Sequence, residues 1–213
     1  MLTQLQKLGV TGLRSDNMME FCASLEKLGN CLRSLKVSAT DSGTSLDSLN
    51  LMSSPPLLLR RLQLCGHLSS LPGWVGLLMN VAKIHLHSTR LGNDALQVLQ
   101  ALPNLTILLL DGDAFCAENL YFGGGFPSLE ALNLLYTLNL DSVIVQGGAA
   151  KLERIEVIGC ETQVFGMENL SHLKEISLHG VRQAFRDSFQ RAVEALPSRR
   201  EVTFRSSITW EDD

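Results

Sequence analysis

Aliphatic residues recur along this chain in a short phrase of the form Leu-x-x-Leu-x-Leu, in which the intervening positions are mostly polar. Successive copies begin 21 to 27 residues apart, at Leu5, Leu32, Leu59, Val81, Leu105, Leu129, Leu152 and Leu173. A degenerate copy, Val202-x-Phe204, follows them. Because side chains alternate between the two faces of a strand, each phrase predicts a short strand with its aliphatic residues inside and its intervening residues outside.

A phrase of this composition and period is typical of a leucine-rich repeat solenoid. One such repeat cannot bury its apolar edge without its neighbours, so we expect residues 1–213 to form a single α/β domain of about nine repeats. The predicted shape is a curved horseshoe arc, with a parallel concave sheet of about nine to ten short strands and irregular loops or short helices on the convex side. Residues 173–208 are expected to form the last repeat and C-terminal cap, before an acidic tail at 209–213.

The segments between the phrases predict which helices and loops form the convex side. Helical spacing of apolar residues favours helices at 16–28, 94–101 and 183–196. Residues 114–127, which include three consecutive glycines, favour an extended loop. An additional phrase at 140–145, Leu-x-x-Val-x-Val, indicates either an extra strand of the concave sheet or an irregular spur, and we favour the extra strand.

Composition and charge exclude several classes of function. The net charge of −4 argues against a general nucleic-acid binder, which would usually be basic. No stretch approaches the ~18 consecutive apolar residues that a membrane span needs. Five cysteines at irregular spacing suit a reducing compartment, so we expect a cytoplasmic protein. The chain opens almost directly on a repeat without a polar cap, which favours an origin in a longer array.

No motif for catalysis or for a cofactor stands out. The Gly-x-Ser-x-Gly elbow and the His-Glu-x-x-His helix are missing from the sequence. His85, His87 and Cys65 on neighbouring predicted strands could supply three zinc ligands, but a structural site normally takes four, and ordinary surface polarity is the simpler interpretation. Asp111, Asp113 and their neighbours lack the calcium-loop pattern. We therefore expect no enzyme activity, no cofactor and no metal.

The outward positions of the predicted strands show a gradient that favours protein binding. The first four strands present cations and no acids, and the middle strands present aliphatic residues. The cationic side could attract an acidic partner, serve as a docking site for another domain of the same protein, or be a solvated face. The apolar side could anchor a partner or reflect tighter packing. The candidate residues are Lys36, Arg61, Lys83, His85, His87, Ile107, Leu109, Leu135, Ile144 and Ile158.

An ordered set of short motifs over roughly residues 25 to 204 resembles the C-terminal leucine-rich region of plant coiled-coil NLR (NB-ARC-LRR) disease resistance proteins. The motifs that carry the resemblance are Ser53-Ser54-Pro55-Pro56, Leu71-Pro72-x-Trp74, Ala101-Leu102-Pro103-Asn104-Leu105, Phe122-Gly123-Gly124-Gly125-Phe126-Pro127, Ile158-Gly159-Cys160 and Asn169-Leu170-x-x-Leu173-Lys174-Glu175.

This resemblance implies an intracellular sensor in plant defence. In that family, the repeats restrain a nucleotide-binding switch and recognise a pathogen effector or a host protein that the effector has altered. The implied partners are therefore an effector, a guarded host protein and the NB-ARC domain of the parent receptor. This chain has no Gly-x-x-x-x-Gly-Lys-Ser/Thr phosphate loop, so it cannot itself bind nucleotide in that way. A stand-alone repeat scaffold without an immune role, or a non-functional fragment of a receptor gene, remain the alternatives.

Overall fold

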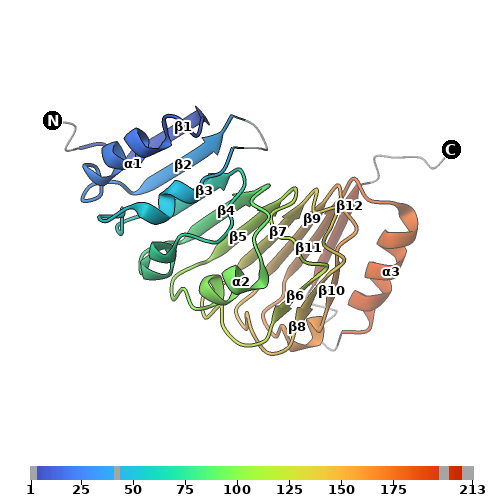
Figure 1. Ribbon diagram of the computed structural model, residues 1–213. Helices are drawn as coiled ribbons and strands as arrows, with labels where there is room; N and C mark the ends of the chain where they lie inside the picture. Colours follow the sequence, from blue (N-terminus) through green and yellow to red (C-terminus); the bar gives the residue numbers. More distant parts are fainter. Residues whose placement is uncertain (1–3, 41–43, 197–201, 208–213) are drawn as a thin grey trace.

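The computed structural model describes residues 4–40, 44–196 and 202–207, and its main feature is a nine-stranded parallel sheet that curves along the solenoid (Figure 1). The strand order is β1-β2-β3-β4-β5-β7-β9-β11-β12, which confirms the predicted solenoid. The strands are β1 (Lys7–Leu13), β2 (Ser34–Ala39), β3 (Arg61–Cys65), β4 (Lys83–His87), β5 (Ile107–Asp111), β7 (Ala131–Leu135), β9 (Arg154–Ile158), β11 (Glu175–His179) and β12 (Thr203–Ser207).

The strands pair so that the aliphatic positions of the repeat stack in rows. Leu62 pairs with Ile84, which pairs with Leu108, and all three side chains are at most 1% exposed. The same row continues through Leu132 and Ile155. A slip of one residue would turn every such side chain to solvent, so the hydrophobic pattern fixes the register. The outward positions of the same strands form the concave surface.

Most concave strands end in a residue with left-handed backbone conformation, which starts the turn to the convex side. Glycine occupies this place after β5 and β9, at Gly112 and Gly159, with φ of 57° and 61°. Ser88 and Tyr136 hold the same conformation after β4 and β7, both with φ of 51°. A side chain at such a position is rare because of its steric cost, so these two residues are strained relative to glycine.

Helices return the chain along the convex side of the first repeats. They are α1 (Met18–Glu26), η1 (Asp47–Leu51), η2 (Gly73–Leu77) and α2 (Asn93–Gln100), while η3 (Met167–Asn169) and α3 (Gln183–Glu194) lie near the other end. The three α-helices confirm the helices predicted from apolar spacing. Trp74 Nε1 donates a 2.9 Å hydrogen bond to the Leu49 carbonyl and so links η2 to η1.

A second, three-stranded parallel sheet replaces helices in the middle of the convex side (Figure 1). Its strands are β6 (Asn119–Phe122), β8 (Ser142–Val145) and β10 (Gln163–Phe165), in the order β10-β8-β6. The additional phrase at 140–145 is therefore a strand, but the prediction that it joins the concave sheet was wrong. Residues 114–127, predicted as a loop, contain β6. The cause is direct pairing of β7 with β9, which leaves β8 on the return path.

One hydrophobic core lies between the two sheets and under the helices. The buried threonines Thr89, Thr137 and Thr162 form hydrogen bonds, and Thr89 donates to the Ala114 carbonyl at 2.8 Å. Thr137 and Thr162 share a 2.8 Å bond between their hydroxyls, and Thr162 donates to the Leu140 carbonyl at 2.8 Å. Within the described ranges, no helix is long and apolar enough to cross a bilayer. The acidic tail expected at 209–213 lies outside the described residues.

Candidate protein-binding surface of the concave sheet

Nine of the ten residues predicted for protein binding lie at outward positions of the concave sheet. β2 and β3 supply one each, β4 supplies three, β5 supplies two, and β7 and β9 supply one each. Each is at least partly exposed in the structure. The exception is Ile144, which was predicted to lie on this face. It lies on β8 of the convex sheet, because β8 pairs with β6 and β10 and not with a concave strand.

The cationic residues line one hollow of about 430 Å³ over β2 to β5. Lys36, Arg61 and Lys83 reach it from three consecutive strands, together with His85. Arg61 and Lys83 are direct cross-strand neighbours. Among the described residues, none of these three cations forms a salt bridge. Three consecutive strands thus each supply a positive charge that is paired with no carboxylate of the described residues, which favours an acidic ligand.

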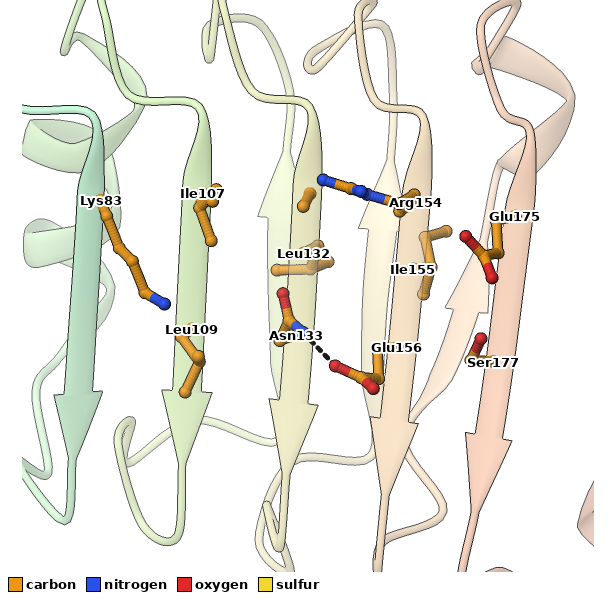
Figure 2. A pocket seen from close by; sticks show the side chains of 11 residues that line it. Lys83, Ile107, Leu109, Leu132, Asn133, Arg154, Ile155, Glu156, Glu175 and Ser177 are labelled. Atoms are coloured by element: carbon orange, nitrogen blue, oxygen red, sulfur yellow. Dashed lines mark hydrogen bonds between the residues drawn. The ribbon is translucent and has the colours of Figure 1, made fainter. Parts of the chain in front are cut away.

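A second hollow of about 320 Å³ adjoins the first and extends toward the C-terminal strands. Lys83 and Ile107 line both hollows. Figure 2 shows the floor of the second one, where Ile107 and Leu109 lie beside Lys83, and Arg154 lies across the sheet from them. The two hollows form one continuous depression, which is cationic over β2 to β4 and apolar at Ile107 and Leu109. Beyond these residues, Arg154, Glu156 and Glu175 give it mixed charge.

A polar pair divides the apolar stripe that the sequence predicted. Asn133 donates from Nδ2 to the Glu156 carboxylate on the next strand, and this bond crosses the sheet beyond Leu109 (Figure 2). Leu135 and Ile158 pair in register on the far side of it, at the ends of β7 and β9. The apolar residues therefore form two patches: one on the floor of the second hollow and one at the rim of the sheet.

The histidines of β4 have a partner that sequence reasoning missed. Asp111 Oδ2 on β5 lies 3.4 Å from His85 Nε2 and 3.0 Å from His87 Nδ1. The signal was available, because His87 and Asp111 occupy the same position of consecutive repeats. Burial lowers the pKa of His85, although Asp111 opposes this shift. The carboxylate therefore offsets only part of the effect of burial on the His85 imidazole.

The possible zinc site of His85, His87 and Cys65 does not form in the structure. Within residues 4–40, 44–196 and 202–207, no group of three or more His, Cys, Asp or Glu side chains is arranged to hold a metal ion. Burial raises the pKa of the Cys65 thiol, so this group is predominantly protonated near neutral pH. All five cysteines are free thiols.

The concave sheet carries acidic side chains at Asp111 on β5, beside the histidines, and at Glu156 and Glu175 toward its C-terminal strands, where cations lie nearby. Glu175 on β11 lies 3.3 Å from Arg205 Nε on β12. Just before the strands, Lys174 Nζ lies 2.6 Å from Glu153 Oε1. The charge of this end is therefore mostly balanced, in contrast to β2, β3 and β4.

Comparison with known proteins agrees with this architecture. A family model described as "Leucine-rich repeat region" matches residues 1–203. The chain belongs to this family.

Its relatives include disease resistance proteins of two plants. The chain is 28% identical over 181 residues to "Disease resistance protein RPM1" of Arabidopsis thaliana, covering 83% of this chain and 19% of that protein. It is 28% identical over 207 residues to "Disease resistance protein Pik-2" of Oryza sativa subsp. japonica, covering 83% and 20%. The chain thus spans about a fifth of the length of these relatives. The resemblance to the repeat region of plant disease resistance proteins is confirmed.

Proposed function

We propose that this chain is the protein-recognition region of an intracellular plant immune receptor, that it works in the cytoplasm and that it catalyses no reaction. The observation that carries the proposal is the continuous depression on the concave sheet, where Lys36, Arg61 and Lys83 adjoin Ile107 and Leu109. The disease resistance proteins among its relatives supply the immune context.

The depression suits a partner that presents carboxylates beside apolar side chains. The cations would raise the association rate of such a partner. Ile107 and Leu109 would become the desolvated centre of the interface, where most binding free energy usually resides. The partner is a pathogen effector or a host protein that an effector has modified.

The same surface also gives a mechanism for restraint. If the NB-ARC domain of the parent receptor occupies the depression in the resting state, an effector that binds there competes with it. The extent of the shift toward the released state is set by the difference between the affinities of the effector and of the NB-ARC domain for this surface. The cations of β2 to β4 would then serve both partners in turn.

The receptor context is tested by sequencing full-length transcripts that contain this coding region. We expect the same reading frame to encode a Gly-x-x-x-x-Gly-Lys-Ser/Thr phosphate loop upstream of the repeats. A transcript that encodes only repeats, or repeats joined to an unrelated domain, would contradict the proposal and favour a stand-alone scaffold.

The surface is tested by charge reversal in the full-length protein. Arg61→Glu combined with Lys83→Glu should remove the partners that proximity labelling in leaf cells identifies for the wild type. Lys27→Glu is the matched control, because Lys27 is an exposed cation at the C-terminal end of α1, on the convex side. Equal labelling by both variants, with expression unchanged, would refute a role for the concave cations.

Leu109→Asp tests the apolar floor separately. Placing a carboxylate beside Ile107 should abolish capture of the same partners, while the fold is retained because Leu109 is only partly buried. Retention of all partners would show that the floor of the hollow does not contribute to recognition.

A further inference from the structure

The outer face of the convex sheet carries a row of large apolar side chains. Tyr121 on β6, Ile144 on β8 and Phe165 on β10 are in register with one another. Tyr121 is 47% exposed and Phe165 is 54% exposed, while Ile144 lies between them, partly buried. Their sequence neighbours Leu120 and Val143 point the other way and are fully buried. We refer to Tyr121, Ile144 and Phe165 as the convex row.

This row differs from scattered exposed apolar residues because register places its members side by side. Cross-strand neighbours on one face have Cβ atoms about 5 Å apart, so the three side chains form one patch. Tyrosine and phenylalanine each bury about 150–250 Å² when covered, and half-exposed rings leave about 100 Å² each open to solvent. The patch therefore has the size of the central anchor of an interface, not of a whole interface.

Acidic residues surround the convex row. The three strands with their flanking residues, 116–125, 139–148 and 160–169, contain four acidic residues and no Lys, Arg or His. Glu118 and Asp141 stand immediately before β6 and β8, and a 2.7 Å backbone bond from Asp141 N to the Glu118 carbonyl shows that they are neighbours. Of the four acids, Glu161 alone forms a salt bridge among the described residues, with Arg182.

The charge of this surface selects the kind of occupant. A symmetric dimer through this face would bring the same acidic residues of two copies together, which is unfavourable. Nucleic acid and anionic lipid headgroups would be repelled for the same reason. A protein segment with apolar anchors and flanking Lys or Arg residues is the complementary ligand.

The surroundings of the row favour binding across its face. Gln100 Nε2 on α2 donates a 3.0 Å bond to the Tyr121 carbonyl, so the free edge of β6 is partly occupied and less suited to strand addition. On the other side, a hollow of about 520 Å³ opens between β10 and α3, lined by Gln163, by Phe185 and by the ion pair of Glu161 with Arg182. This hollow can receive a side chain of a segment that lies across the row.

We propose that the convex row is a docking surface for a cationic amphipathic segment of a partner protein, and that it acts independently of the concave depression. Tyr121, Ile144 and Phe165 contact the apolar side of that segment, and Glu118 and Asp141 face its Lys or Arg residues. The inference does not depend on the immune role proposed above, since it rests on a different face of the solenoid.

The test uses two synthetic helical peptides and the purified chain. One peptide has Leu and Trp on one face and Lys on the other, and the second replaces every Lys with Glu. We expect fluorescence anisotropy to show binding of the Lys peptide and little binding of the Glu peptide, with the affinity weakened by salt. Equal binding of both peptides by the wild type would overturn the proposal.

Single substitutions locate the site. Phe165→Ser and Tyr121→Ser should each weaken binding of the Lys peptide about tenfold or more, as loss of a central aromatic anchor usually does. Leu77→Ser is the matched control, because Leu77 is 59% exposed at the end of η2, on the convex side but separated from β6 by α2. A Phe165→Ser variant that binds as tightly as Leu77→Ser contradicts the assignment.

Charge reversal and two alternative ligands complete the test. Glu118→Lys with Asp141→Lys should reverse the preference from the Lys peptide to the Glu peptide. Hydrogen exchange should show protection of β6 and β10 by the Lys peptide in the wild type.

Two other occupants of the convex row are tested directly. One outcome is dimerisation of the wild type that Phe165→Ser abolishes, and the other is binding to anionic phospholipid vesicles through the same residues. Either outcome would assign the surface to a different occupant and overturn the proposal.

Discussion

The concave and convex sheets of this solenoid are built from the same kind of parallel pairing but present opposite surfaces. The concave sheet has nine strands and shows solvent a mixture of charges, amides and a few aliphatic residues. The convex sheet has three strands, and its outer face carries Tyr121, Ile144 and Phe165 beside acidic residues. Both sheets bury an aliphatic row against one core, through Leu132 and Val143 for example.

The difference shows that burial restricts the type of residue only at the inward positions of a repeat. The inward residues of both sheets are constrained by close packing, so nearly all of them are apolar. The outward residues are free of that constraint, and each sheet can therefore carry its own charge and its own partner. One solenoid thus offers a cationic surface and an acidic surface on opposite sides.

The largest expected loss of stability comes from a substitution in the core that the two sheets share. Phe122 is fully buried and stacks on Phe126 at 4.7 Å, whereas Phe165 on the same sheet is 54% exposed. Phe122→Ala should cost about 3–5 kcal/mol of unfolding free energy because it leaves a cavity. Phe165→Ala should change it by no more than about 0.5 kcal/mol. Urea denaturation measures both, and equal losses would show that the two sheets do not divide into inward and outward faces as described.

A smaller loss of stability is expected at the buried threonines that join the turns of adjacent repeats. Thr162→Val removes the donor to the Leu140 carbonyl and the partner of the Thr137 hydroxyl. Leaving buried polar groups unsatisfied should cost about 1–3 kcal/mol. Thr203→Val on β12, an exposed position, is the control and should be nearly neutral. Unchanged urea midpoints for Thr162→Val would mean that water or another group replaces the bond.

Acidification should destabilise the concave side through His85. Because burial lowers its pKa in the folded state, the unfolded chain binds the proton more readily. The contribution of neutral His85 to the unfolding free energy is therefore fully present above the usual histidine pKa of about 6.5. It is lost as pH falls toward the pKa of His85 in the folded state. NMR titration should place the His85 pKa below its ordinary value, and His85→Gln should flatten the dependence of the urea midpoint between neutral and mildly acidic pH. A variant that keeps the full pH dependence would assign it to other groups.

The smallest effect is expected at the ion pair beside the convex sheet. Arg182 Nε donates to Glu161 Oε1 at 2.6 Å, and Arg182 lowers the Glu161 pKa. Arg182→Ala should raise the Glu161 pKa toward its ordinary value and cost only about 0.2–1 kcal/mol, because Arg182 is mostly exposed. NMR titration of the Glu161 side chain tests the first point, and an unchanged pKa would contradict the pairing.

Sequence periodicity predicted the concave strands and three helices, but it placed one strand on the wrong face. Leu140, Val143 and Val145 have the spacing of a repeat, and nothing in that spacing says whether the strand lies on the concave or the convex side. Pairing of β7 with β9 decides this, and it moves Ile144 away from the predicted site. The link from Asn133 to Glu156 was missed for the same reason, because it requires direct pairing of β7 with β9. The link from Asp111 to His87 was within reach, since the two residues hold the same position of consecutive repeats.

The amino-acid pattern alone is enough to specify the solenoid, because an aliphatic phrase at a fixed period can bury its apolar residues only by stacking. It also determined which residues face outward on each strand, since strand alternation is local. Which outward residues share a surface depends on how the strands pair in the folded protein. Neighbours across a sheet come from different repeats, so pairing order and register, not position along the chain, bring Lys83 beside Ile107 and Tyr121 beside Ile144.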